Sequence, residues 1–425
     1  MAAGPAVFSD QQGLLDDGAL AFLLRSIFSD PTFQAYLFQQ ISTAPNRVRT
    51  YDELRDVLNG FFQQTIPAAQ GEDRERLMEH AKEYQRHCAE TEAAWNAYSG
   101  EGKANPMGVF WPNPTRKDGK SLKQVTPVGE RFPLVDRTTP IGSAGSCFAY
   151  EIARNLQRRG YNYVVTEPEH DGSKGVVVDG YDPDNPHARF SATWGLVFNT
   201  PSLRQLAERA FGEAGPSPIL VEERFPNGGV IYTDPYREGV AFSGPQAFQA
   251  DGPAHLQAVR RAFTETKIFI VTLGLNECWE LKADGTVLSN NPRRGWMFAL
   301  SRPRVLTVAE NVAEVERFLT LVRTHNPDFK VILSLSPIPL MATHRSDQHV
   351  ITANAHSKAV LRVAAEEIVA RNDGVYYFPS YEYVMHCAED AWCPDERHVT
   401  DETVDKIMAM FDDMFMKDGG AEPNG

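Results

Sequence analysis

Two segments in the second half of the chain, KIFIVTLGL (267–275) and KVILSLSPIP (330–339), are almost wholly apolar, and each follows an amphipathic helical pattern. Such runs, which do not alternate apolar with polar residues, are typical of parallel strands covered on both faces. TTPIGSAGS (138–146) enters a glycine turn and a helical pattern, and GVYYFPSYEYV (374–384) follows a long helical pattern. This repeated order of strand, turn and helix predicts an α/β fold over residues 138–425, with a parallel sheet between two layers of helices. Further strands are expected at YNYVVTEP (161–168) and VIYTD (230–234).

Residues 1–104 show no strand pattern and predict a helical addition to this fold. Apolar residues recur at helical spacing over residues 20–41, and Thr50 with Glu53 forms a capping box that opens another helix. We expect this region to pack, to self-associate or to bind a protein partner. Residues 105–137 are rich in proline, which predicts an irregular connector.

The charge balance limits the partners of the chain. With 42 Lys and Arg against 56 Asp and Glu, the net charge of −14 argues against binding to nucleic acid or to anionic membranes. No run approaches 18 apolar residues, and acidic residues occupy the start of the chain where a signal peptide is neutral or basic. Five cysteines, an odd number, imply no disulfide framework. These features predict a cytoplasmic protein without membrane insertion.

Polar residues that could act in catalysis follow the predicted strands, because open parallel sheets gather their reactive groups at the strand ends. Ser146 and Cys147 follow the first strand, Asn276 follows KIFIVTL, and Asp395 precedes His398 by three residues just before the last helical pattern. A thiol at a helix N-terminus is expected to have a lowered pKa and free backbone N–H groups nearby for an oxyanion. An Asp beside a His can fix the tautomer of a general base. Taken singly, each pattern also has a structural explanation: a tight turn, a turn asparagine or a surface histidine.

In this order, the three patterns resemble the layout of the SGNH (GDSL-like) hydrolase superfamily over residues 138–416. GSCFA (145–149) resembles the signature of the GSCFA family, a bacterial branch usually grouped with SGNH enzymes. FWP (110–112), TLGLNECW (272–279) and LSPIP (335–339) resemble further landmarks of that family. The resemblance implies a three-layer SGNH-type fold and an esterase or O-acyltransferase with a covalent acyl-enzyme. It implies a small-molecule or glycan acyl substrate and no cofactor or metal.

The resemblance also implies roles for five residues. Cys147 falls where the superfamily has its nucleophilic serine, His398 where it has the base, and Asp395 where it has the partner of that base. Asn276 matches the amide of the oxyanion hole. The backbone N–H of Gly195, in ATWGLVFNTP, is the second oxyanion donor.

Departures from the superfamily pattern leave two questions open. Ser146 stands where Asp is usual and Cys147 where Ser is usual, so Ser146 and Ser143 remain alternative nucleophiles. A thioester passes its acyl group to an alcohol or an amine as well as to water, so hydrolysis and transfer both remain open.

Competing interpretations come from other classes of protein. The chain could be a non-catalytic scaffold or binding protein on a retired SGNH fold. His386, Cys387, Cys393 and His398 lie close in sequence, but without the paired spacing of structural zinc sites. GSAGS after a strand is not the glycine pattern of a dinucleotide-binding loop.

For other residues that could act in catalysis or binding, we expect a structural role. His344, Arg345 and His349, in the loop after LSPIP, could line the cleft, but we expect a solvated loop there. Trp279 is expected to pack in a core at least as readily as to stack on a sugar.

Overall fold

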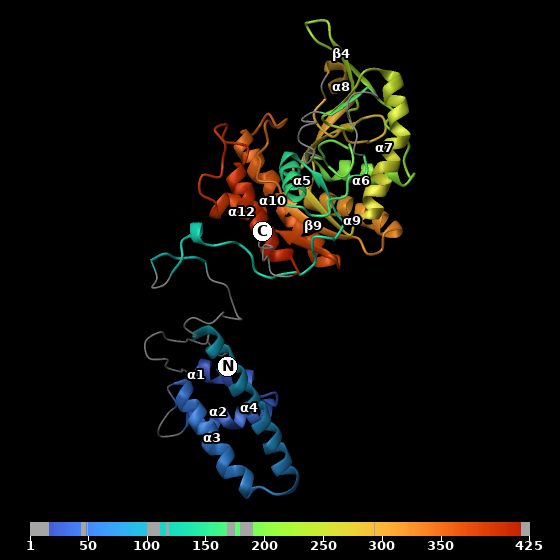
Figure 1. The fold of residues 1–425 in the computed structure, drawn as a ribbon. Coiled ribbons are helices and arrows are strands. Elements are labelled where there is room, and N and C mark those ends of the chain that lie inside the picture. Colours follow the sequence, from blue (N-terminus) through green and yellow to red (C-terminus); the bar gives the residue numbers. More distant parts are fainter. Residues whose placement is uncertain are drawn as a thin grey trace. The chain divides into compact units, whose positions relative to one another are not determined.

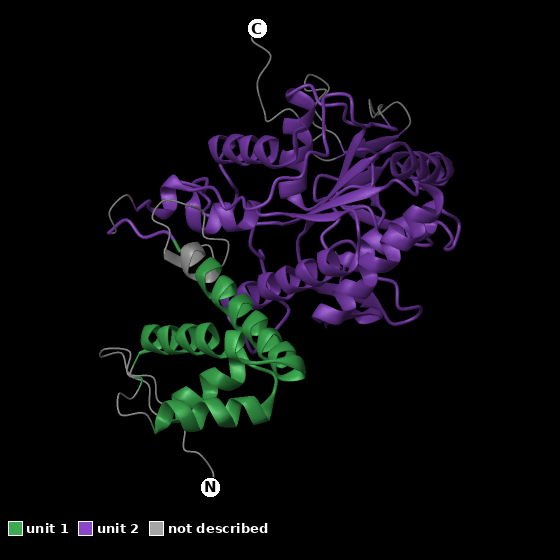
Figure 2. Cartoon of the chain, turned by 90° about the horizontal axis from the view of Figure 1, so that it is seen from below, with its two compact units in different colours: residues 1–111 green, residues 112–425 purple. Residues whose placement is uncertain are grey.

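A computed structural model describes residues 17–43, 48, 50–99, 111–115, 119–167, 175–178, 190–292 and 294–417. The chain divides into two compact units, Met1–Trp111 and Pro112–Gly425 (Figure 2). Phe110 of the FWP motif, and the part of the predicted connector before it, lie outside the described residues.

Helices make up the described part of the smaller unit. They are α1 (Asp17–Ile27), α2 (Pro31–Ser42), α3 (Tyr51–Ala68) and α4 (Gly71–Ser99). The predicted capping box is confirmed: the Thr50 side chain accepts from the Glu53 N–H, and the Glu53 carboxylate accepts from the Thr50 N–H. The residues predicted at helical spacing form one core, with Leu20, Leu24 and Leu37 at most 3% exposed.

The larger unit is built on a sheet of four parallel strands. In spatial order these are β1 (Ile141–Gly145), β6 (Ile268–Leu273), β9 (Lys330–Leu335) and β10 (Val375–Phe378). The predicted parallel sheet is therefore confirmed. Gly145 pairs with Thr272 and Thr272 with Ser334, so the carboxyl ends of the first three strands lie side by side.

Two hydrophobic clusters lie on opposite faces of this sheet, which explains why its strands do not alternate in polarity. Along β6, Phe269 and Val271 belong to one cluster, and Ile268 and Ile270 to the other. One cluster includes residues of α5 (Cys147–Arg158) and α12 (Asp401–Phe415). The other includes residues of α6 (Thr200–Ala210), α7 (Pro245–Glu265), α9 (Val308–His325) and α10 (Val350–Arg371). Figure 1 labels these helices around the sheet. The larger unit is thus a mixed α/β structure with helices on both faces of its parallel sheet.

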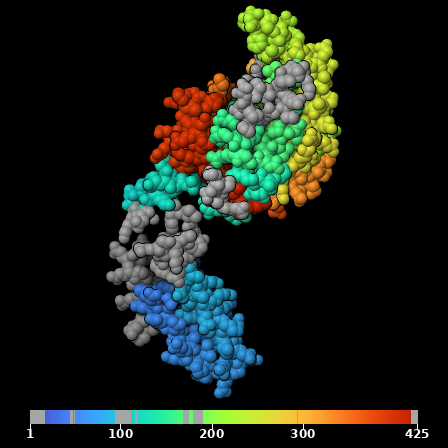
Figure 3. All heavy atoms as spheres, in the orientation of Figure 1, coloured from blue at the N-terminus to red at the C-terminus, as the bar shows by residue number. Residues whose placement is uncertain are grey.

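Antiparallel strands form two smaller sheets in this unit. One has the order β2 (Val176–Val178), β5 (Val240–Phe242), β4 (Val230–Thr233) and β3 (Val221–Arg224), and the other pairs β7 (Glu277–Leu281) with β8 (Ser301–Val305). Strand β4 confirms the expectation at VIYTD, and its hairpin with β3 projects from the body of the unit (Figures 1 and 3). The remaining short elements are η1 (Leu122–Gln124), α8 (Gly295–Leu300), α11 (Ser380–Glu382) and η2 (Tyr383–Cys387).

Two predicted strands differ from the structure. Residues 161–167 follow the edge of β1 but form only one bridge, between Ile141 and Tyr163. The strand predicted through residue 384 ends at Phe378, because Pro379 has no N–H to continue the ladder and the chain turns into α11.

From Pro112 onward, the described residues of the predicted connector belong to the larger unit. The Phe132 N–H donates to the Met414 carbonyl at 2.7 Å, and Val135 is fully buried. Among the described helices, none is long and apolar enough to cross a membrane.

Candidate active site

A pocket of about 750 Å³ opens at the carboxyl ends of β1, β6 and β9. Its walls come from the turns after these strands: Ser146 and Cys147 after β1, Gly274 and Leu275 after β6, and Ser336 with residues 338–344 after β9. The remaining lining residues are Phe198, Glu277, Trp279, Asn290, Asn291, Pro292 and Arg397. The strand ends that the sequence analysis singled out therefore share one pocket.

The turn between β1 and α5 places two reactive side chains on the pocket wall. A Cβ on Gly145 would lie 2.6 Å from the Thr272 carbonyl oxygen, so the close approach of the two strands requires glycine there. Ser146 is the N-cap residue of α5 and Cys147 its first helical residue, although the Ser146 side chain makes no capping hydrogen bond. Backbone N–H groups in the first turn of a helix lack intrahelical partners, and the helix dipole favours negative charge there.

The environment of the Cys147 thiol differs from our expectation. Burial raises the pKa of Cys147, and the positive charge of Arg397 offsets only part of that effect. The expected lowering of this pKa is therefore wrong, because the side chain is largely removed from water. A thiol that keeps its proton at neutral pH needs a base before it can act as a nucleophile.

Asp395 and His398 form a hydrogen-bonded pair in the loop before α12. One Asp395 oxygen accepts from the N–H groups of Arg397 and His398 at 3.1 and 3.0 Å, and the other lies 2.5 Å from His398 Nδ1. These hydrogen bonds lower the pKa of Asp395 to about 2. The ionised carboxylate favours a proton on Nδ1 and leaves Nε2 as the basic nitrogen. His398 does not line the pocket, but its neighbour Arg397 does, with Nη1 3.4 Å from His398 Nε2.

The two residues expected to form the oxyanion hole, Asn276 and Gly195, lie outside the pocket lining. Asn276 is fully buried, its N–H donates to Ser357 Oγ at 3.1 Å, and its Nδ2 donates to the Leu306 carbonyl at 3.2 Å. Gly195 has a φ of +70°, and a Cβ there would lie 2.0 Å from the Glu238 carbonyl oxygen. Neither residue lines the pocket, so their oxyanion role remains a prediction.

Several buried polar atoms near the strand ends have no hydrogen-bond partner among the described residues. They are Ser146 Oγ after β1, Thr272 Oγ1 in β6, Asn276 Oδ1 after β6 and Ser336 Oγ after β9. Buried polar groups are nearly always paired, so a cluster of orphans needs an explanation. Ser146 and Ser336 line the pocket, where a bound molecule can complete their hydrogen bonds.

Glu277 and His344 form a second pair of this kind, which the sequence analysis missed. The buried Glu277 carboxylate accepts from the Thr343 hydroxyl at 2.8 Å and lies 3.0 Å from His344 Nδ1. Both members line the pocket, and the His344 side chain is only 15% exposed. The expectation of a solvated loop is therefore wrong for His344. Local spacing gives no signal for a pair 67 residues apart, and only the adjacency of β6 and β9 brings the two together.

Lys358 connects two segments that line the pocket, the turn after β6 and the segment after β9. Its buried Nζ donates to the Gly274 carbonyl at 3.0 Å and to the Ile338 carbonyl at 2.8 Å. Burial, with a smaller effect of the Arg397 charge, lowers the pKa of Lys358 to about 7. The turn after β6 is thereby tied to the segment after β9.

The model of the GSCFA family matches residues 140–411. The chain belongs to the GSCFA family. No curated protein matches it. A carbohydrate esterase family 3 structure from Talaromyces cellulolyticus has 11% identity and a TM-score of 0.30, covering 64% of this chain and 94% of that chain. A mutant acetyl esterase, solved with an acetate ion, also has 11% identity and a TM-score of 0.30, covering 64% of this chain and 92% of that chain. Similarity this low carries no argument about the GSCFA protein.

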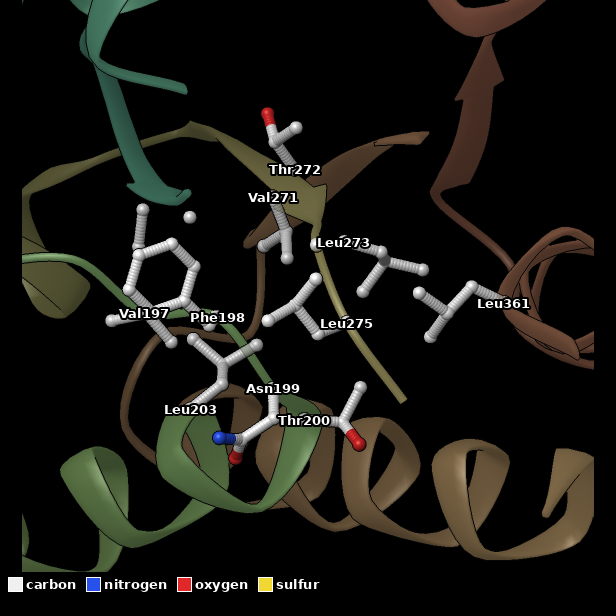
Figure 4. A pocket seen from close by; sticks show the side chains of 13 residues that line it. Val197, Phe198, Asn199, Thr200, Leu203, Val271, Thr272, Leu273, Leu275 and Leu361 are labelled. Carbon is white, nitrogen blue, oxygen red and sulfur yellow. The ribbon is translucent and has the colours of Figure 1, made fainter. Parts of the chain in front are cut away.

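A second, smaller cavity of the GSCFA domain lies among α6, α10 and the strand ends. Figure 4 shows Val197, Leu203, Leu273 and Leu361 converging on it, whereas Thr272 points away. Its volume of about 10 Å³ is no larger than one water molecule requires. We therefore assign it to packing beneath the site.

Within the described part of the GSCFA chain, no group of three or more His, Cys, Asp or Glu residues is arranged to hold a metal ion.

Proposed function

We propose that the larger unit hydrolyses acyl esters or transfers their acyl groups through a covalent acyl-enzyme on Cys147. One observation carries this proposal: Cys147, at the N-terminus of α5, shares a pocket of about 750 Å³ with the unpartnered hydroxyls of Ser146 and Ser336. A nucleophile, free backbone N–H groups and unsatisfied donors on one concave surface are what acyl transfer requires.

In the first half-reaction, His398 Nε2 must exchange its contact with Arg397 Nη1 for the Cys147 thiol, whose proton it takes as Sγ attacks the ester carbonyl. Asp395 holds the opposite ring nitrogen and stabilises the imidazolium that forms. The tetrahedral intermediate collapses, the carbon–oxygen bond of the ester breaks, and His398 returns the proton to the departing alcohol. The products are a thioester on Cys147 and a free alcohol.

The N–H groups of Cys147 and Phe148 in the first turn of α5 are a source of oxyanion stabilisation beside the nucleophile, whereas the Ala149 N–H already donates to the Ser146 carbonyl at 2.8 Å. Asn276 and Gly195 remain the donors that the SGNH resemblance implies. For Asn276 to act, its Nδ2 must exchange the Leu306 carbonyl for the substrate oxygen. We also propose a small-molecule or glycan acyl substrate, a cytoplasmic location and a protein partner for the helical unit.

Intact mass measurement after exposure to p-nitrophenyl acetate tests the proposal. We expect a single acetyl adduct that persists in Ser146→Ala and Ser143→Ala and is lost in Cys147→Ala. An adduct lost in Ser146→Ala but kept in Cys147→Ala would move the nucleophile to Ser146. If the unaltered protein forms no adduct, the proposal fails and a non-catalytic binding protein becomes the better interpretation.

A further inference from the structure

The pocket holds a histidine–carboxylate pair that the first half-reaction does not use. Glu277 begins β7 and is 8% exposed. Its carboxylate accepts from the Thr343 hydroxyl, and it accepts from the His344 N–H at 3.3 Å. A third contact, of 3.0 Å, joins it to His344 Nδ1. Three contacts to two adjacent residues fix both the position and the tautomer of the imidazole.

The surroundings of the ring leave its other nitrogen available to a ligand. With Nδ1 facing Glu277, the proton resides on Nδ1 and the lone pair on Nε2. Nε2 has no hydrogen-bond partner among the described residues, and His344 lines the pocket. The Trp279 ring packs against the imidazole at a centroid distance of 5.8 Å, and Trp279 Nε1 donates to Asn291 Oδ1 at 3.0 Å. This wall is therefore held rigidly from two sides.

We propose that His344, oriented by Glu277, is the general base that activates the acyl acceptor in the second half-reaction. This assignment rests on the proposed function. His398 belongs to the loop of Arg397, whose charge acts on the Cys147 thiol, whereas His344 belongs to the segment after β9. The two histidines thus approach the pocket from different elements, which suits two successive proton transfers.

In this step, His344 Nε2 takes the proton of an acceptor hydroxyl as the hydroxyl oxygen attacks the thioester carbonyl. The tetrahedral intermediate collapses, the carbon–sulfur bond breaks and Cys147 leaves as a thiolate. The imidazolium releases its proton to solvent, and the thiolate takes a proton from solvent. The products are the acylated acceptor and free Cys147 thiol.

The lining beside His344 indicates the class of acceptor. Asn290, Asn291 and Trp279 present amides and an aromatic ring, and the Glu277 carboxylate is already engaged by Thr343 and His344. A neutral hydroxyl compound satisfies such amides without placing a charge in the pocket, and its apolar face can pack on the indole. The acceptor is therefore a polyol or sugar hydroxyl, with water as its substitute in hydrolysis.

Burst kinetics with p-nitrophenyl acetate separate the two half-reactions. The burst of p-nitrophenolate reports acylation of Cys147, and the steady-state rate reports deacylation. For His344→Ala we expect an unchanged burst and a steady-state rate lower by about 10²-fold or more. Glu277→Gln should keep the burst and lose part of the steady-state rate, because the amide no longer favours the required tautomer. His349→Asn is the matched control, since exposed His349 caps α10 through its side chain and should leave both phases unchanged.

Two additions distinguish a chemical role of His344 from a structural one. Added imidazole should raise the steady-state rate of His344→Ala. Hydroxylamine, which needs no base to attack a thioester, should release the acetyl group equally fast from the variant and the unaltered enzyme. The assignment is overturned if the variant turns over normally, if its burst slows together with turnover, or if hydroxylamine release is impaired. Absence of any acetyl adduct in the unaltered protein refutes the proposed function first, and this assignment with it.

Discussion

Replacing Lys358 by Met tests how a buried cation holds the pocket together. Met retains the length of the side chain but removes the Nζ that donates to the Gly274 and Ile338 carbonyls. Each hydrogen bond to a charged group contributes about 1.5–3 kcal/mol, and the substitution leaves two carbonyls unpartnered. Against this loss, the variant no longer has to bury an ammonium group.

The balance between these effects depends on pH, and its sign follows from the pKa of Lys358. Burial lowers that pKa from 10.5 to about 7 in the folded protein. Between pH 7 and pH 10.5 the unfolded chain therefore carries one proton more than the folded protein. Stability from this group therefore rises with pH through that window and is constant below it. Between pH 7 and pH 9 the free energy of unfolding of the unaltered protein should gain about 2 kcal/mol over that of Lys358→Met. A neutral amine still has two N–H groups, enough for both carbonyls.

Urea unfolding of both proteins at several pH values, followed by near-ultraviolet circular dichroism, measures this difference. Subtracting the free energy of unfolding of one protein from that of the other cancels the contribution of every group that titrates alike in both. Lys406→Met is the control, because exposed Lys406 has its pKa raised by the hydrogen bond to Glu402 and should give a constant difference from pH 7 to pH 9. A constant difference for Lys358→Met as well would refute the argument, since Lys358 would then keep its charge in the folded protein.

Three further substitutions and one alkylation measurement test the turn after β1 and the loop before α12. Gly145→Ala places a Cβ 2.6 Å from the Thr272 carbonyl oxygen, which should lower the free energy of unfolding by about 1–3 kcal/mol; an unchanged urea midpoint would show that the strands separate freely. Asp395→Asn removes the carboxylate that fixes the His398 tautomer, so the acylation burst should slow by about 10²-fold or more, and an unchanged burst would exclude this pair as the base. The alkylation rate of Cys147 by iodoacetamide should rise with pH to a midpoint above that of a free thiol, because burial raises its pKa. Arg397→Gln should move this midpoint higher still, and a midpoint below neutrality would contradict the burial argument.

Much of the fold follows from the sequence because the sheet is buried on both faces. Strand β6 has apolar residues at both odd and even positions. Ile268 and Phe269, for example, belong to two different clusters. A parallel strand covered on both faces needs this pattern, and its alternation with helical patterns along the chain was enough to predict the sheet. The edge segment at residues 161–167 was predicted as a strand on its apolar content, but its backbone forms a single bridge to β1. The β-propensity of a segment does not determine how many backbone hydrogen bonds it forms with a neighbouring strand.

The site was predictable down to the strand ends and no further. Parallel pairing aligns Gly145 with Thr272 and Thr272 with Ser334, so the turns that follow must meet in one place. Which side chain of a turn enters the pocket is decided by backbone rotation, and successive side chains of an extended chain face opposite ways. Asn276 and Glu277 show the consequence, because Asn276 is fully buried against the Leu306 carbonyl while Glu277 lines the pocket.

This one-residue alternation bears directly on the two roles assigned near the end of β6. If Asn276 is an oxyanion donor, the turn must rotate on acylation, and the same rotation would carry Glu277 away from His344. The two roles therefore compete within one conformation. A turn that keeps Glu277 on His344 in the acyl-enzyme leaves the oxyanion to the N–H groups of α5. Asn276→Ala should then slow the acylation burst far less than it lowers stability, because its main loss is the hydrogen bond to Leu306. A burst that slows by about 10²-fold or more, with stability unchanged, would restore Asn276 to the oxyanion hole and require the turn to move.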